Sequence, residues 1–244
     1  MKYDDVIIVI PARYNSTRLP GKSLADINGL PMVVRVMKIS ESINLCDVIV
    51  ATESEKVADA VRKYNGKVIL TSDDLKSGTD RVFQALNCLG KQYKYVINLQ
   101  GDMPNINANI IETVVELLHE KSNADIVTAV YKITDQSWRQ KTQCVKAVLA
   151  YNEKENFHKC LYFSRSDIPY GEGDAFAHLG IYGYRIDSLK KFVSLPVSSL
   201  EKSEKLEQLR ALENGMHIYA TVVDSFPISV DVAEDLENAR KYIK

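Results

Sequence analysis

The amino-acid sequence predicts an α/β protein with a mostly parallel sheet that helices cover on both faces. Two observations support this class. Strand-like and helix-like segments alternate through the first half of the chain, as they do in right-handed βαβ units. The strand-like segments are also continuous apolar runs, such as DVIIVI at 5–10 and YVINLQ at 95–100, which is typical of strands buried on both faces.

The first half of the chain contains four pairs of such elements. The pattern predicts strands at 5–10, 47–52, 67–71 and 95–100, and helices at 30–40, 54–64, 77–89 and 109–121. Ligands of parallel α/β sheets bind beyond the carboxyl ends of the strands. The segments PARYNSTRLPGK, ATES and QGDMP each follow a predicted strand, and we expect a site where they meet.

The second half is less regular. Strands are predicted at 124–133 and 144–151, as a possible antiparallel pair, and at 217–224; helices are predicted at 199–214, ending at Gly215, and at 232–243. The mixture of aromatic, glycine and charged residues at 152–185 suits a lobe beside the sheet. We therefore expect a single domain, 1–244, with a smaller lobe at approximately 144–198.

Composition narrows the class of protein. The 244 residues include 31 Lys and Arg against 32 Asp and Glu, for a net charge of −1, so the sequence does not indicate a nucleic-acid binder. The four cysteines are far apart and form no zinc or disulfide pattern. Without a long apolar stretch or a signal-peptide cleavage site, we expect no membrane partner and a cytoplasmic protein.

The segment RYNSTRLPGKS at 13–23 raises the question of phosphate binding, because it ends in GKS as a P-loop does. A P-loop needs GxxxxGK[ST], and Ser16 stands where its first glycine is required. The segment is therefore not a P-loop, although Arg13, Arg18 and Lys22 suit the oxygens of a polyphosphate. The alternative is a solvated loop whose cations only add solubility, and spacing alone leaves both open.

Asp102 is a candidate metal ligand because it directly follows the strand 95–100. A carboxylate facing a triphosphate needs a divalent cation between the two, and Mg²⁺ is bound by one or two carboxylates together with phosphate oxygens. This predicts a second acid, for which Asp231 is the candidate. The alternative is that Asp231 and Glu234 form a capping box at the start of the last helix.

Together these segments resemble the 3-deoxy-manno-octulosonate (Kdo) cytidylyltransferases, over almost the whole chain. The blocks that carry the resemblance are PARYNSTRLPGK, VIVATES, SGTDR, INLQGDMP, LYFSRSDIP, HLGIYGYR, LEKSEKLEQLR and VDVAEDL. The resemblance implies a sugar-nucleotidyltransferase, Rossmann-like fold and Mg²⁺-dependent transfer of CMP from CTP to Kdo, with release of pyrophosphate. It also implies a role in lipopolysaccharide biosynthesis and a homodimer formed through the second-half lobe.

The resemblance also implies roles for individual residues. Catalysis is assigned to Arg13, Lys22, Asp102 and Asp231, the last two as metal ligands. The nucleotide is assigned to Pro11, Ala12, Arg13, Arg18, Lys22, Thr52, Ser77, Gly78, Arg81 and Gln100. The sugar acid is assigned to Gln100, Arg165, His178, Tyr182, Glu207 and Gln208. Without the motif, His178 would be read as a buried core histidine and Glu207 and Gln208 as a solvated helix face.

Three positions depart from the family pattern, and the first two concern the substrate. Met103 stands where relatives have Glu, the segment at 170–177 is short, and VDVAEDL replaces VDTPEDL. A rival enzyme reading is activation of another sugar acid, such as sialic acid or an amino-Kdo variant. A rival from another class is a catalytically silent CTP- or sugar-binding regulator, which the joint presence of the phosphate-loop cations and both candidate metal acids argues against.

Overall fold

The computed structural model describes residues 3–16 and 18–243. The chain forms two compact units, Met1–Glu112 with Pro227–Lys244, and Thr113–Phe226. The lobe expected at 144–198 falls within the second unit, and the expectation of a single domain stays a prediction. Each unit is described by itself below.

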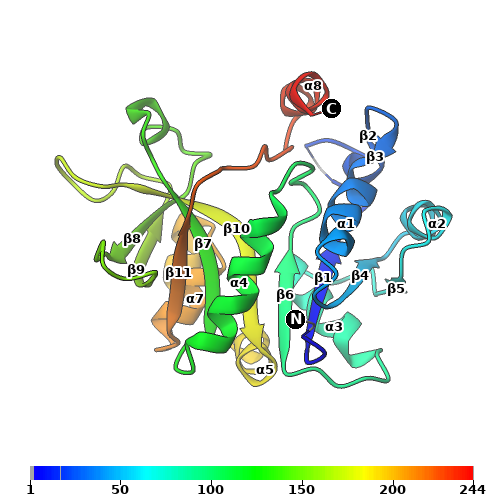
Figure 1. The fold of residues 1–244 in the computed structure, drawn as a ribbon, viewed down its shortest axis with the longest axis horizontal. Helices are drawn as coiled ribbons and strands as arrows, with labels where there is room; N and C mark the ends of the chain where they lie inside the picture. Colours follow the sequence, from blue (N-terminus) through cyan, green and yellow to red (C-terminus); the bar gives the residue numbers. More distant parts are fainter. Residues whose placement is uncertain (1–2, 17, 244) are drawn as a thin grey trace. The chain divides into compact units, whose positions relative to one another are not determined.

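The first unit contains a parallel sheet. Its strands are β1 (Val6–Pro11), β4 (Asp47–Thr52), β5 (Val68–Leu70) and β6 (Tyr95–Leu99), in the order β5-β4-β1-β6 (Figure 1). All of the pairings are parallel, as the sequence predicts. Every residue of β1 is buried, which explains why this strand is a continuous apolar run.

Three helices connect these strands: α1 (Met32–Ser42), α2 (Glu55–Lys63) and α3 (Gly78–Asn87). α1 and α2 pack on β4, whereas α3 packs on β1, β4 and β6. The chain moves from β1 to β4 to β5 in one direction and then returns to β6 on the other side of β1. Because the crossovers are right-handed, this reversal places α3 on the face opposite α1 and α2. The carboxyl ends of β1 and β6 therefore meet at a topological switch point, where α/β sheets bind ligands.

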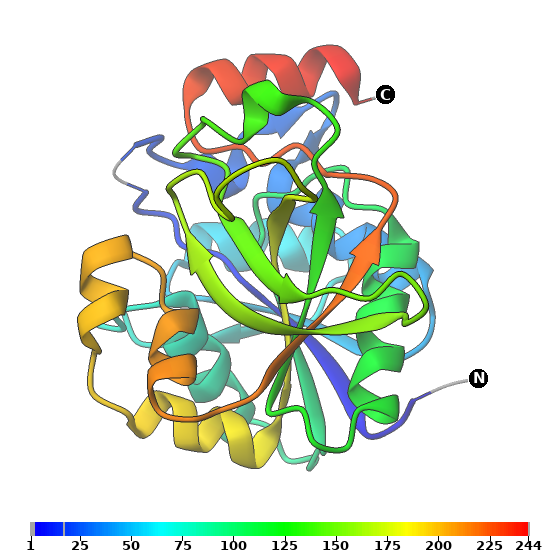
Figure 2. The same ribbon diagram turned by 90° about the vertical axis from the view of Figure 1, so that its left-hand side faces the viewer.

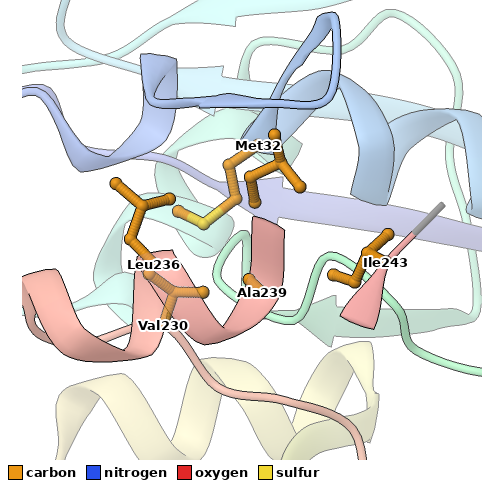
Figure 3. Packing of buried hydrophobic residues seen from close by; sticks show 6 residues of the cluster. Met32, Val230, Leu236, Ala239 and Ile243 are labelled. Carbon is orange, nitrogen blue, oxygen red and sulfur yellow. The ribbon is translucent and has the colours of Figure 1, made fainter. Parts of the chain in front are cut away.

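The C-terminal helix α8 (Ala233–Tyr242) belongs to the first unit and lies beside the short hairpin β2 (Asp26–Ile27) and β3 (Leu30–Pro31) (Figures 1 and 2). Arg240 Nε donates to the Asp26 carbonyl at 2.9 Å. A buried apolar cluster joins these elements (Figure 3); it consists of Ile27, Met32, Val230, Leu236, Ala239 and Ile243. Leu19 packs against it. The cluster ties the last helix to the segment that precedes Asp231.

The second unit contains five strands whose pairing closes on itself. They are β7 (Ile126–Lys132), β8 (Lys146–Ala150), β9 (Phe157–Ser164), β10 (Phe176–Arg185) and β11 (Ile218–Val223) (Figure 2). Their order is β10-β7-β11-β9-β8, and β8 also pairs with β10. The possible pairing of 124–133 with 144–151 is therefore wrong, because β7 lies between β10 and β11.

The predicted helix at 199–214 is two helices, α6 (Ser199–Glu204) and α7 (Gln208–Glu213). Lys205 has φ 56°, a left-handed conformation that ends α6. The sequence has no glycine at this position that would have predicted the break. Gly215 has φ 71° and follows α7, as predicted. The unit also contains the short 3-10 helix η2 (Gln136–Trp138) and the helix α5 (Ile186–Ser194), and α4 (Ala108–Glu120) crosses the sequence boundary between the units. No helix in the described part of the chain has the length and apolarity needed to cross a bilayer.

Candidate active site

A cavity of about 290 Å³ lies in the first unit, at the carboxyl ends of β1 and β6. Most of the predicted nucleotide and phosphate residues line it, and they come from the end of β1 and the loop after it, the first turn of α3 and the segment after β6. The lining residues are Pro11, Ala12, Arg13, Asn15, Ser16, Arg18, Lys22, Ser23, Met32, Gly78, Arg81, Gln100, Gly101 and Asp102.

The loop after β1 folds around its own backbone. The Gly21 amide donates to the Tyr14 carbonyl at 3.1 Å, and the Ser23 hydroxyl donates to the Arg13 carbonyl at 3.1 Å. Gly21 has φ 71°, which a glycine adopts without strain, and it begins the short 3-10 helix η1 (Lys22–Leu24). This turn brings Lys22 back toward the cavity, whereas Arg13 remains largely exposed and donates to the Leu75 carbonyl.

Lys22 lies between the two predicted metal acids. Its Nζ is 2.9 Å from Oδ2 of Asp102 and 3.2 Å from Oδ1 of Asp231, and Arg18 Nη2 is 3.0 Å from the same Asp231 oxygen. Burial alone would lower the pKa of Lys22, but the two carboxylates outweigh it and raise that pKa above its ordinary value. The two acids therefore converge on one point where a positive charge is stabilised.

Asp231 does not cap α8 with its side chain. Instead Asp235, in the first turn of the helix, accepts through Oδ2 the amides of Asp231 and Val232, the two residues that precede α8, at 2.9 and 3.0 Å. The alternative capping box of Asp231 with Glu234 is therefore wrong, and the Asp231 carboxylate is left to the cations of the phosphate loop. The Val230 amide donates to the Asp102 carbonyl at 2.9 Å and joins the two acidic segments through the main chain.

Arg81, on α3, is fully buried and lines the cavity. Its Nη1 donates to Thr71 and to the Ser72 carbonyl, and lies 3.3 Å from Oε2 of Glu53. Nε and Nη2 of Arg81 have no hydrogen-bond partner among the described residues. Burial lowers the pKa of Arg81, with Glu53 opposing that shift. Unpartnered buried donors are costly, which indicates that a ligand supplies their acceptors.

Glu53 contacts two parts of the candidate site and was not predicted from the sequence. Its Oε1 accepts the Tyr14 amide at 2.8 Å, so one buried carboxylate contacts both the phosphate loop and Arg81. The signal was available, because Glu53 lies in ATES, a segment singled out by its place after a strand. Asn15, Ser16, Ser23, Met32 and Gly101 also line the cavity without having been predicted.

Two of the predicted nucleotide residues, Thr52 and Ser77, have other surroundings. Thr52 is fully buried, and its hydroxyl accepts the Ser54 amide at 3.2 Å. Ser77 is the N-cap of α3 in a capping box with Asp80. Neither residue lines the cavity, although Gly78 and Arg81 of the same motif do. Gln100 lines the cavity and donates through Nε2 to Asn98 at 2.8 Å.

Arg165, at the end of β9 in the second unit, is held on several sides. Its amide donates to Oε2 of Glu204 at 3.0 Å and its Nε to the Glu204 carbonyl at 3.1 Å. Its Nη1 donates to the Thr142 carbonyl at 3.1 Å, while Nη2 has no partner among the described residues. Burial would raise the pKa of Glu204, but hydrogen bonds led by those from Ser164 and the Arg165 amide outweigh it and lower that pKa. The remaining face of the guanidinium can accept a carboxylate.

His178 and Tyr182 lie together on β10, with ring centroids 5.3 Å apart. The register of β10 is shifted between Leu179 and Tyr182, and the Thr128 hydroxyl lies 2.7 Å from the Ile181 carbonyl and 2.9 Å from His178 Nε2. Because that hydroxyl has one proton and donates it to the carbonyl, His178 Nε2 donates to the hydroxyl. Burial lowers the pKa of His178 to about 3, so the ring is neutral with Nδ1 as an acceptor.

Glu207 and Gln208 follow the break between α6 and α7. Glu207 raises the pKa of Tyr182, after the larger effect of burial, so the two side chains are electrostatically close. Gln208 is buried, and its Nε2 has no hydrogen-bond partner within the described residues. The two residues are therefore not a solvated helix face, and Gln208 carries an unused donor.

Met103, the departure from the family pattern, is buried and does not line the cavity. In the short 170–177 segment the side chain of Tyr170 is fully exposed. Across residues 3–16 and 18–243, no group of three or more His, Cys, Asp or Glu side chains is arranged to bind a metal.

The chain is similar in sequence and fold to known cytidylyltransferases. The cytidylyltransferase family model matches residues 7–218. A 3-deoxy-manno-octulosonate cytidylyltransferase of Paramagnetospirillum magneticum is 45% identical over 98% of this chain and 97% of its own length. One of Rickettsia prowazekii is 44% identical over 100% of this chain and 97% of its own length.

A solved structure supports the same assignment. The structure of CMP:2-keto-3-deoxy-manno-octonic acid synthetase complexed with CTP superposes with a TM-score of 0.90 at 36% identity, covering 98% of both chains. The α/β nucleotidyltransferase fold expected from the sequence is thereby confirmed. The chain belongs to the 3-deoxy-manno-octulosonate cytidylyltransferase family.

Proposed function

We propose that this chain transfers CMP from CTP to the anomeric hydroxyl of Kdo, giving CMP-Kdo and pyrophosphate for lipopolysaccharide biosynthesis. The observation that carries the proposal is the convergence of Asp102 and Asp231 on Lys22, beside a cavity at the switch point of a parallel sheet. This cluster combines a cation for phosphate oxygens with two acids for a divalent metal, which nucleotidyl transfer requires.

The nucleotide occupies the cavity of the first unit. Arg13, Arg18 and Lys22 bind the triphosphate, because all three line the cavity and their side chains carry fixed positive charge. The two unpartnered donors of Arg81 suit the acceptor atoms of a cytosine ring, O2 and N3. Gly78 and Gly101 present no side chain, which leaves room at the cavity wall.

Asp102 and Asp231 would hold Mg²⁺, with phosphate oxygens of CTP as further ligands. The donor set fits, because Mg²⁺ takes one or two carboxylates and fills its other positions with phosphate and water. The Lys22 ammonium, within 3.2 Å of one oxygen of each acid, shows that both carboxylates reach a common cation. When bound, the metal would polarise the reacting phosphate and neutralise the leaving pyrophosphate.

The sugar acid is bound by residues of the second unit. Arg165 binds the Kdo carboxylate through its free guanidinium face. Nδ1 of His178 accepts a hydrogen bond from a sugar hydroxyl, and the unpartnered Nε2 of Gln208 donates one to another oxygen of the sugar. Tyr182 and Glu207 are the other residues of the second unit that we assign to sugar binding.

In the reaction, the anomeric oxygen forms a bond to the α-phosphorus while the bond from that phosphorus to the bridging oxygen of pyrophosphate breaks. Pyrophosphate leaves with the electron pair, and the hydroxyl proton passes to solvent. The cations of residues 13–22 stabilise the charge that spreads over the phosphate oxygens. No protein general base is required. We further propose that the enzyme is a cytoplasmic homodimer.

The test is product identification by mass spectrometry after incubation with CTP, Mg²⁺ and one sugar acid at a time. Kdo, an amino-Kdo analogue and sialic acid are compared with a reaction that lacks sugar. A CMP-Kdo product that exceeds the others supports the proposal. If only the amino analogue gives a product, the proposed reaction stands but its substrate is amino-Kdo and not Kdo. If CTP binds and no sugar gives a product, the protein is better explained as a catalytically silent regulator.

A further inference from the structure

Lys146, the first residue of β8, is a fully buried lysine that the proposed reaction does not use. Its Nζ donates to three main-chain carbonyls, those of Lys141 at 3.0 Å, Cys144 at 2.7 Å and Arg165 at 2.7 Å. Every proton of the ammonium group therefore has an acceptor. Burial lowers the pKa of Lys146, since desolvation opposes its charged form.

The strand register places Lys146 between two residues that directly precede sugar-site candidates. On one side it pairs with Ser164, which precedes Arg165, and on the other with Ala177, which precedes His178. This position exists only because β8 pairs with both β9 and β10. A change at Lys146 therefore acts on both strand ends at once.

The carbonyls of the turn before β8 serve two cations. The carbonyls of Lys141 and Cys144 accept hydrogen bonds from Lys146 Nζ. The carbonyl of Thr142, which lies between them in the sequence, accepts a hydrogen bond from Arg165 Nη1. Lys146 is therefore hydrogen-bonded both to the turn that binds the Arg165 side chain and to the Arg165 carbonyl. Glu204 holds the amide and Nε of Arg165 from another side.

We propose that Lys146 is a positioning residue for Arg165, whose buried ammonium fixes both the Arg165 main chain and the 141–144 turn so that the guanidinium meets the substrate carboxylate in one orientation. A buried cation without a carboxylate on its nitrogen is expensive to keep. Orientation of a carboxylate-binding arginine is a gain that a purely apolar side chain at this place could not provide. The inference rests on the proposed function, because it needs Arg165 to bind the sugar acid.

The test compares steady-state kinetics of the wild type with Lys146→Met, a side chain of similar length without charge or donors. We expect the KM for Kdo to rise about tenfold, the loss typical of one misaligned charge-assisted hydrogen bond, while the KM for CTP changes less than about twofold. Lys159→Met is the matched control, because Lys159 is an exposed lysine on the neighbouring strand β9. It should leave both KM values unchanged.

A double-mutant cycle separates positioning from a general structural effect. Arg165→Met should raise the KM for Kdo by itself, and Lys146→Met should add little in that background. Equal effects of Lys146→Met with and without Arg165, or equal rises in the KM for Kdo and CTP, would overturn the inference. Lys146→Gln, which keeps an amide donor, should give a smaller rise than Lys146→Met.

Folding and function are controlled separately. If Lys146→Met does not fold, the same comparison is made with Lys146→Gln. If both variants fail to fold while Lys159→Met stays folded, Lys146 is a structural residue and the inference is overturned. A wild type that forms no CMP-Kdo would overturn the proposed function, and this inference with it. An active wild type with an unchanged Kdo KM in a folded Lys146→Met would overturn the inference alone.

Discussion

Asp102 and Asp231 are joined twice, through the Nζ of Lys22 at 2.9 and 3.2 Å and through the Val230 amide, which donates to the Asp102 carbonyl at 2.9 Å. The second link fixes the backbone on which Asp231 stands. The apolar cluster around Val230 and Leu236 holds the same segment from the side of α8 (Figure 3). Two acids far apart in the sequence are thus held at one cation position.

Asp102→Asn and Asp231→Asn should each lower the rate of pyrophosphate release by roughly 10³-fold or more, because each removes a charge that we assign to metal binding. Asn is nearly isosteric, so the circular dichroism spectrum should not change. Asp59→Asn, at an exposed acid on α2, is the control and should keep full activity. A double variant of Asp102 and Asp231 with near wild-type turnover would contradict the metal assignment.

Arg81→Met should raise the KM for CTP about tenfold or more, since it removes the two donors that we assign to cytosine. The variant also leaves the Glu53 carboxylate without its cationic partner, so Glu53→Gln is introduced with it to restore stability. Arg62→Met, at an exposed arginine of α2, is the matched control. An unchanged CTP KM in the folded double variant would remove Arg81 from the nucleotide site.

His178 should make the protein less stable as the pH falls. The folded-state pKa is about 3 and the ordinary value 6.5, so between these pH values the unfolded chain binds a proton that the folded protein excludes. Stability from this group is complete above pH 6.5 and is lost as the pH drops toward 3, by about 2 kcal/mol between pH 7 and 5. Urea unfolding at both pH values should show a smaller loss in the free energy of unfolding for His178→Asn than for the wild type. An identical loss would refute the lowered pKa of His178.

Gly183→Ala should destabilise the second unit by about 1–3 kcal/mol through overpacking. A Cβ at this position would lie 2.6 Å from Cγ2 of Val127 and 2.7 Å from Cδ1 of Leu118. Gly173→Ala is the matched control, because a Cβ there has no atom within 4 Å. Thermal unfolding of the two variants measures the difference, and equal midpoints would show that the site relaxes at no cost.

The first unit could be predicted from the sequence because its signals are local. Strands buried on both faces, such as β1, are continuous apolar runs, and the phosphate-loop cations follow β1 directly. Parallel pairing with right-handed crossovers then brings Lys22 and Asp102 to one edge. Spacing could not decide whether Asp231 caps the last helix, because a capping acid and a metal acid look alike before a helix. Only the side-chain contacts of Asp235 exclude the cap.

The second unit was predicted less well because its order depends on contacts between distant segments. Nothing local in the sequence indicates that β8 pairs with both β9 and β10, or that Lys205 adopts a left-handed conformation and divides one helix into two. The role of Lys146 was invisible for the same reason: a lysine in an apolar strand gains its partners only from the turn before it and from Arg165.

The most direct test of the central claim is pyrophosphate release from CTP by the wild-type enzyme with Kdo, in the presence of Mg²⁺ and again after EDTA. The account predicts release that depends on Kdo, stops when EDTA is added and returns when Mg²⁺ is restored, because Asp102 and Asp231 need the metal to face a triphosphate. Release that continues unchanged in EDTA, or no release although CTP is bound, would contradict it.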